Sequence, residues 1–173
     1  MKKIWILTIA LLLTASAVRA FDTTPLQIGI WPPTLQIVPP EINVSGLKLN
    51  LPYGGNNDIV GVDLGICSTS NNTSAFQVNP LFNLVEDDYK GFQVSLFNLC
   101  GNSSGIQIGV IMNSTDRVAS GLQIGIINSA LEMNGVQIGI VNYSNFMVGV
   151  QIGLANIITD SIVPFFPIIN FCF

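Results

Sequence analysis

The stretch from Gly105 to Leu154 reads GIQIGVIMNSTDRVASGLQIGIINSALEMNGVQIGIVNYSNFMVGVQIGL. It repeats the pattern G-φ-Q-φ-G-φ-φ-N, where φ is an apolar residue, in four closely similar copies that begin at Gly105, Gly121, Gly135 and Gly149. Degenerate copies upstream begin 14 to 16 residues apart, at Gly46, Gly61, Ala75 and Gly91. Because this array fills residues 46–173, the sequence predicts one β-repeat domain and no second domain.

Apolar and polar residues alternate within each unit. The second, fourth and sixth positions are apolar in nearly every copy, as Val136, Ile138 and Ile140 illustrate. The third position is always polar, and its occupants are Lys48, Asp63, Gln77, Gln93, Gln107, Gln123, Gln137 and Gln151. A period of two in β-branched residues is typical of strands, and the asparagines that follow favour turns. The density of glycine excludes helix, so the sequence predicts an all-β fold.

Two arrangements of these strands fit the pattern. The preferred one is a parallel β-solenoid, in which each unit forms one coil, like residues stack about 4.8 Å apart and the repeated amides form ladders. The alternative is an antiparallel β-meander closed into an outer-membrane barrel, which the terminal Phe173 and the wholly polar segment 68–74 favour. Against the barrel, the apolar alternation covers only about five to six residues per unit, whereas a membrane strand needs about 9–11.

The two ends of the chain differ from the array. Residues 1–20, with Lys2 and Lys3 before an apolar run and Ala20 at the end, have the pattern of a cleaved bacterial signal peptide. Residues 21–45 form an N-terminal segment that leads into the array. The array closes with an aromatic segment that contains Phe165, Phe166, Phe171 and Phe173. We expect this segment either to cap the last coil or to act as an assembly signal for a barrel.

Composition and charge exclude several classes of function. The chain has no histidine, which excludes Ser-His-Asp and Cys-His catalysis and any His-ligated zinc site. Beyond residue 20, three cationic residues stand against ten acidic ones, a net charge of −7, so binding to nucleic acid is not expected. The acidic cluster Glu86-Asp87-Asp88 matches no calcium-binding spacing and is interpreted as a solvated turn. We expect no catalysis, no cofactor and no metal.

The cysteines and the third-position residues complete the predictions. Cys67, Cys100 and Cys172 are expected to be buried thiols, with a Cys67–Cys100 disulfide as the alternative that export would permit. Lys48 and Asp63, in successive units, are expected to form an exposed cross-strand ion pair. The uninterrupted polar column is interpreted as a candidate binding face, formed by Gln77, Gln93, Gln107, Gln123, Gln137 and Gln151.

The tandem motif, together with the closing sequence VPFFPIINFCF, resembles the GxQxGxxN surface-repeat proteins of leptospires and other bacteria. The resemblance covers most of residues 26–173 and implies a location in the cell envelope, without implying any enzymatic activity. Some members are lipoproteins, whereas no cysteine lies near residue 20 of this chain. The expected function is that of a secreted envelope or surface protein with a structural or adhesive role, and the alternative is an integral outer-membrane barrel.

Overall fold

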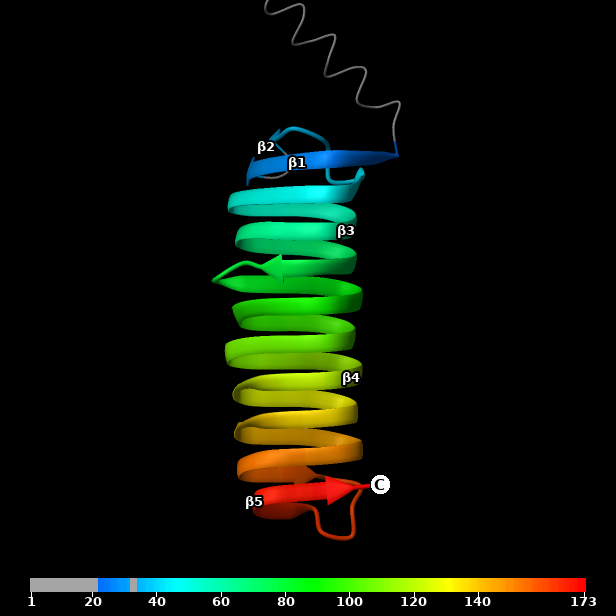
Figure 1. Ribbon diagram of the computed structural model, residues 1–173, viewed down its shortest axis with the longest axis vertical. Coiled ribbons are helices and arrows are strands. Elements are labelled where there is room, and N and C mark those ends of the chain that lie inside the picture. Colours follow the sequence, from blue (N-terminus) through cyan, green and yellow to red (C-terminus); the bar gives the residue numbers. More distant parts are fainter. Residues whose placement is uncertain (1–21, 32–33) are drawn as a thin grey trace, which may run out of the picture.

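The computed structural model describes residues 22–31 and 34–173, which wind into a stack of coils along one axis (Figure 1). In chain order the strands are β1 (Thr23–Trp31), β2 (Leu35–Gln36), β3 (Asn43–Val78), β4 (Phe82–Ile158) and β5 (Phe165–Cys172). β3 and β4 each continue through several coils, which explains their lengths of 36 and 77 residues. The predicted signal peptide, residues 1–20, lies outside the described residues.

Neighbouring coils pair in parallel, in the register that the repeat predicts. Ala75 lies opposite Gly91, and Gln77 lies opposite Gln93. Each coil consumes one repeat, so equivalent residues stack directly and their amides meet. The structure confirms the all-β fold and the preferred parallel solenoid. The alternative, an antiparallel meander closed into a barrel, is wrong because the ladder between β3 and β4 is parallel.

The chain enters most units, though not the one that begins at Ala75, through a glycine whose backbone conformation other residues rarely adopt. The φ angle is 122° at Gly121 and 144° at Gly135. A Cβ on Gly135 would also overlap the carbonyl oxygen of Gly121, one coil earlier. The sharp bend and the close approach of adjacent coils together explain why the repeat begins with glycine.

The solenoid begins before residue 46, within the N-terminal segment 21–45. β1 pairs in parallel with β3 and places Gln27 opposite Lys48, so the polar column already includes Gln27. β2 returns antiparallel to β1. Gln27 is fully buried and exchanges two hydrogen bonds of 3.1 Å with the main chain of Val38: its Nε2 donates to the carbonyl oxygen, and the amide nitrogen donates to its Oε1.

The aromatic C-terminal segment caps the last coil. β5 runs antiparallel to the end of β4, with Phe171 opposite Val150, Asn170 opposite Gln151 and Ile169 opposite Ile152 (Figure 1). Pro167 is accommodated because β5 is the final edge strand, where an amide donor can be missing. Covering the edge of β4 in this way protects the array from end-to-end pairing.

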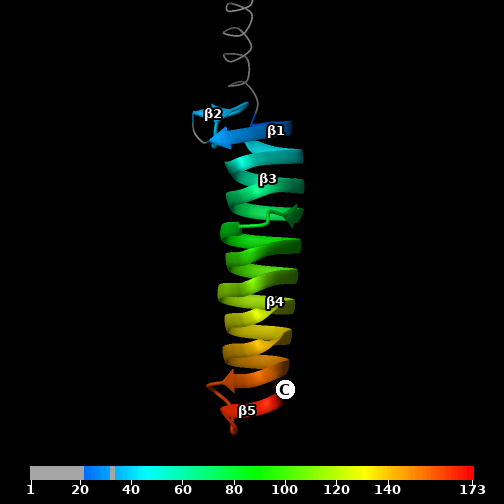
Figure 2. The same ribbon diagram turned by 90° about the vertical axis from the view of Figure 1, so that its left-hand side faces the viewer.

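The coils are flattened, as the narrower profile after a 90° turn shows (Figure 2). One side of each coil is the G-φ-Q-φ-G-φ strand, and the other is the return half, which we define as the residues between the asparagine of one unit and the leading glycine of the next. Inward side chains of the return halves build two apolar clusters. One contains Val85, Tyr89 and Cys100, and the other contains Ala119, Ala130, Met133, Met147 and Ile158.

Candidate functional site

The strands in the first half of the units present an apolar outer surface along the whole solenoid. This surface, the apolar wall, comprises residues 26–30, 47–51, 62–66, 76–80, 92–96, 106–110, 122–126, 136–140 and 150–154, and ends at 169–171 of β5. Many of its side chains are well exposed, including 48% of Ile140 and 70% of Leu154. Monomeric soluble proteins rarely expose a continuous apolar patch beyond a few hundred Å² unless it serves an interaction.

Stacking gives the apolar wall a regular relief. Its central column, from the fourth position of each unit, consists of Ile28, Leu49, Leu64, Val78, Val94, Ile108, Ile124, Ile138, Ile152 and Ile169. In the neighbouring second-position column, the rings of Phe76 and Phe92 stack with centroids 5.1 Å apart and planes inclined by 7°. The columns run perpendicular to the strands, so the wall consists of parallel rows of aliphatic and aromatic side chains.

The apolar wall carries no outward charge within residues 22–31 and 34–173. The two charged residues in its strands, Lys48 and Asp63, are fully buried and point inward. The surface charges of the coils lie on the return halves, at Asp58, Glu86, Asp87, Asp88, Lys90, Asp116, Arg117 and Glu132. The solenoid therefore has one uncharged apolar side and one charged side.

The glutamine column does not form an exposed binding face, and this prediction is wrong. Its six members are at most 1% exposed, because they point into the solenoid. Each Nε2 donates to the preceding member of the column, at 2.9 Å from Gln93 to Gln77, and at 2.8 Å from Gln137 to Gln123 and from Gln151 to Gln137. Burial costs little here because each amide finds its partner one coil away.

Asparagines form a second buried amide column. Nδ2 of Asn128 donates to Oδ1 of Asn142 at 2.8 Å and to the carbonyl oxygen of Ile138 at 2.9 Å. Asn128 therefore binds both the corner asparagine and the wall strand of the next coil. This column donates toward the C-terminus, opposite to the glutamine column. The glycine at the fifth position of the unit makes room for it, since a Cβ on Gly139 would lie 2.6 Å from Nδ2 of Asn128.

Lys48 and Asp63 form a buried network rather than the predicted exposed ion pair. Nζ of Lys48 donates to Oγ of Ser68 at 2.9 Å, and this hydroxyl donates to Oδ2 of Asp63 at 2.5 Å. Asp63 also accepts from Gln77 at 2.8 Å and from Asn50 at 2.6 Å, so its carboxylate receives the first donor of the glutamine column. Burial lowers the pKa of Lys48 to about 8, although the charge of Asp63 acts to raise it.

The acidic cluster 86–88 is exposed on the return half. Arg117 lies 3.4 Å from Oδ1 of Asp87, and both side chains are at least half exposed, so the pair contributes little to stability. Asn102 donates to Asp88 at 2.7 Å as part of an outer amide column. Within the part of the chain that the structure describes, no three His, Cys, Asp or Glu side chains are grouped to hold a metal ion.

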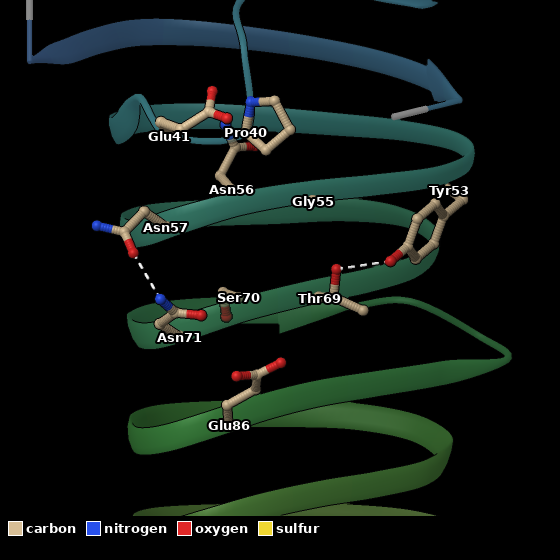
Figure 3. A pocket seen from close by; sticks show the side chains of 10 residues that line it. All are labelled: Pro40, Glu41, Tyr53, Gly55, Asn56, Asn57, Thr69, Ser70, Asn71 and Glu86. Carbon is tan, nitrogen blue, oxygen red and sulfur yellow. Dashed lines mark hydrogen bonds between the residues drawn. The ribbon is translucent and has the colours of Figure 1, made fainter. Parts of the chain in front are cut away.

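A cavity of about 480 Å³ opens beside the N-terminal coils (Figure 3). Most of the residues that line it have polar side chains: the hydroxyls of Tyr53 and Thr69 are 2.9 Å apart, and Asn71 donates to Asn57 at 2.6 Å. Glu41 and Glu86 also lie along it, on different coils (Figure 3). These contacts continue the stacking of the coils, and the lining offers neither a nucleophile activated by a base nor a cluster of ligands.

A larger cavity of about 730 Å³ lies at the C-terminal end. Its lining is mainly apolar and includes Ile162, Phe166, Ile169 and Phe173. It lies open to solvent between β5 and the loop that precedes β5, so it belongs to the cap of the solenoid.

The three cysteines are free thiols, and the alternative of a Cys67–Cys100 disulfide is wrong. Cys67 and Cys100 are buried, and Cys172 is partly exposed. Burial raises the pKa of the Cys100 thiol, which lies among Gln107, Ser103 and Thr115. A neutral buried thiol of this kind fills space in the core and has little nucleophilic reactivity.

The apolar wall is a candidate functional surface that the sequence interpretation missed. The signal was present as apolar residues at alternate positions, but the interpretation placed the glutamines outside. A scan against protein families and searches of characterised proteins and solved structures find no match for this chain. In the described part of the chain, no helix has the length and apolar character needed to cross a membrane.

Proposed function

We propose that this protein is an exported structural component of a bacterial cell envelope, and that it assembles through the apolar wall. The observation that carries the proposal is the uncharged apolar surface that runs from β1 to β5, with Ile140 48% and Leu154 70% exposed. An isolated chain would leave this surface in water, which is unfavourable by about 25 cal/mol per Å². A partner that covers the wall removes this cost.

The rest of the molecule suits a structural role. The glutamine column cross-links successive coils from Asp63 to Gln151, and the cap at β5 covers the last one. The ion pair between Arg117 and Asp87 of the acidic cluster is exposed to solvent. The charged groups of Lys48 and Asp63 are buried and hydrogen-bonded through Ser68. The proposal therefore assigns no catalytic step, cofactor or nucleic acid to the chain.

The proposal also includes export. It draws on the signal-peptide pattern of residues 1–20 and on the resemblance to envelope repeat proteins. The free thiols neither require nor oppose an oxidising compartment, because Cys67 and Cys100 are shielded from reagents by burial.

The test combines localisation with cross-linking in intact cells. The full chain is expressed in a Gram-negative host with a photo-reactive p-benzoylphenylalanine in place of Val110, which lies on the apolar wall and is 55% exposed. The matched control carries the same group in place of Phe146, which is 51% exposed on a return half. We expect a processed, extracytoplasmic chain that cross-links from the wall and not from the return half. An unprocessed cytoplasmic chain, or equal cross-linking from both positions, would contradict the proposal.

A further inference from the structure

We propose that the partner of the apolar wall is the apolar wall of a second copy of this chain, in a symmetric face-to-face dimer. This inference rests on the proposed function, which requires the wall to be covered, and it names what covers it. Three features of the structure support the choice: the area of the wall, the placement of charge, and the regular relief.

The area of the wall matches what a stable dimer needs. About ten strands spaced 4.7–4.9 Å apart make the wall ~45 Å long, and five residues at ~3.3 Å each make it ~17 Å wide. Each copy would then cover a plane of ~750 Å², so a dimer would bury ~1,500 Å² in total, within the range of specific protein interfaces. Two flat sheets pack in this way at a separation of ~10 Å, with interdigitating side chains.

The placement of charge favours a second copy over a membrane. The surface charges, such as Asp87, Asp116 and Glu132, lie on the return halves, so two acidic chains can meet wall to wall without opposing their charges. Elements that lie on a membrane surface add Lys or Arg beside their apolar side. Here Lys90 and Arg117 lie on return halves and Lys48 is buried, so among the described residues no cation borders the wall.

The relief of the wall suits a two-fold axis. An isologous contact requires a surface that complements itself. The wall meets this requirement because its strands repeat with one spacing along the solenoid, so the ridges of one copy can lie in the grooves of another. The glutamine column lies inside the solenoid, where Gln137 donates to Gln123 at 2.8 Å. The outer surface of the wall therefore has no polar column that would need a chemically distinct partner.

The test measures the molar mass of the mature chain from residue 21 by light scattering after gel filtration. The wall variant is Ile126→Lys/Ile140→Lys, at residues that are 45% and 48% exposed. The matched control is Leu131→Lys/Phe146→Lys, at return-half residues that are 45% and 51% exposed. We expect twice the single-chain mass for the wild type and the control, and the single-chain mass for the wall variant.

Circular dichroism checks that each variant folds. If the lysine variant of the wall does not fold, Ile126→Thr/Ile140→Thr, which keeps β-branched residues, is used in its place. A wild type that stays monomeric up to about 0.1 mM would overturn the inference, since its dimer would then be weaker than that Kd. A dimer that the wall variant leaves intact would overturn it equally, as would a monomer that binds phosphatidylcholine vesicles. A cross-link from Val110 to a different protein would overturn the dimer while leaving the proposed function standing.

Discussion

Removing one member of the glutamine column should destabilise the protein by an amount that the structure allows us to work out. Gln137→Leu keeps a similar volume but deletes three hydrogen bonds: those to Gln123 and from Gln151, both 2.8 Å long, and one of 3.4 Å to the carbonyl oxygen of Tyr143. Oε1 of Gln123 then has no donor, whereas Nε2 of Gln151 keeps Ser144 and the carbonyl oxygen of Ile157.

The expected cost follows from these contacts. One orphaned buried acceptor costs about 1–3 kcal/mol and each lost hydrogen bond about 1 kcal/mol. Burial of the leucine side chain offsets roughly 1–2 kcal/mol of this. We expect Gln137→Leu to lower the free energy of unfolding by about 2–5 kcal/mol, measured by urea denaturation followed by circular dichroism.

A double-mutant cycle makes this prediction specific to the amide ladder. Gln123→Leu/Gln137→Leu removes both partners of one bond, so it should cost less than the sum of the two single substitutions by at least about 1 kcal/mol. Leu131→Gln, an outward substitution on a return half, is the control and should change stability by no more than about 0.5 kcal/mol. A single substitution as mild as this control, or a strictly additive cycle, would refute the reasoning.

Three further predictions concern the buried charge, the fifth-position glycine and the thiols. The pKa of Lys48 is lowered from 10.5 to about 8, so the unfolded chain holds more protons between these values. The wild type should therefore gain roughly 3 kcal/mol of stability relative to Lys48→Met between pH 7.5 and 10.5; a constant or falling difference in denaturation experiments would be incompatible. Gly139→Val should abolish cooperative melting, because its Cβ would overlap the carbonyl oxygen of Gly125 and the amide of Asn128; a normal melt would argue against the packing. Cys100 should react with a thiol reagent only after unfolding, because burial raises its pKa; rapid labelling of the folded chain would contradict this.

The repeat predicted the fold because a parallel solenoid converts sequence period directly into register. Gln77 and Gln93 are equivalent in the sequence, and they are neighbours in the structure. The positive φ of the leading glycines and the corner asparagines also follow from the motif. The solenoid extends upstream of residue 46, since β1 carries the same pattern in a single degenerate copy around Gln27.

Alternation alone does not predict which side of each strand faces the interior of the solenoid. A period of two shows that Gln137 and Ile138 point to opposite sides, but it does not show which side is inside. The usual rule that apolar residues are buried fails here because each buried glutamine from Gln93 onward donates to the glutamine one coil earlier. The missing side chain of Gly139 also leaves room for the amide of Asn128. The network of Lys48 could not be predicted either, because alternation does not show that Lys48 points inward. Its partner Ser68 also lies 20 residues away in the sequence.

The central claim is that the third-position glutamines point into the solenoid and the apolar side chains of the same strands point outward, and one pair of adjacent substitutions tests it most directly. The free energy of unfolding is measured for Gln123→Lys and Ile124→Lys at a protein concentration at which the wild type is monomeric. Gln123 is 1% exposed, so its replacement should bury an unpaired charge and abolish folding. Ile124 belongs to the apolar wall, so its replacement should keep the fold and change stability by no more than about 1 kcal/mol. The reverse result, with Gln123→Lys folded and Ile124→Lys unfolded, would contradict the account.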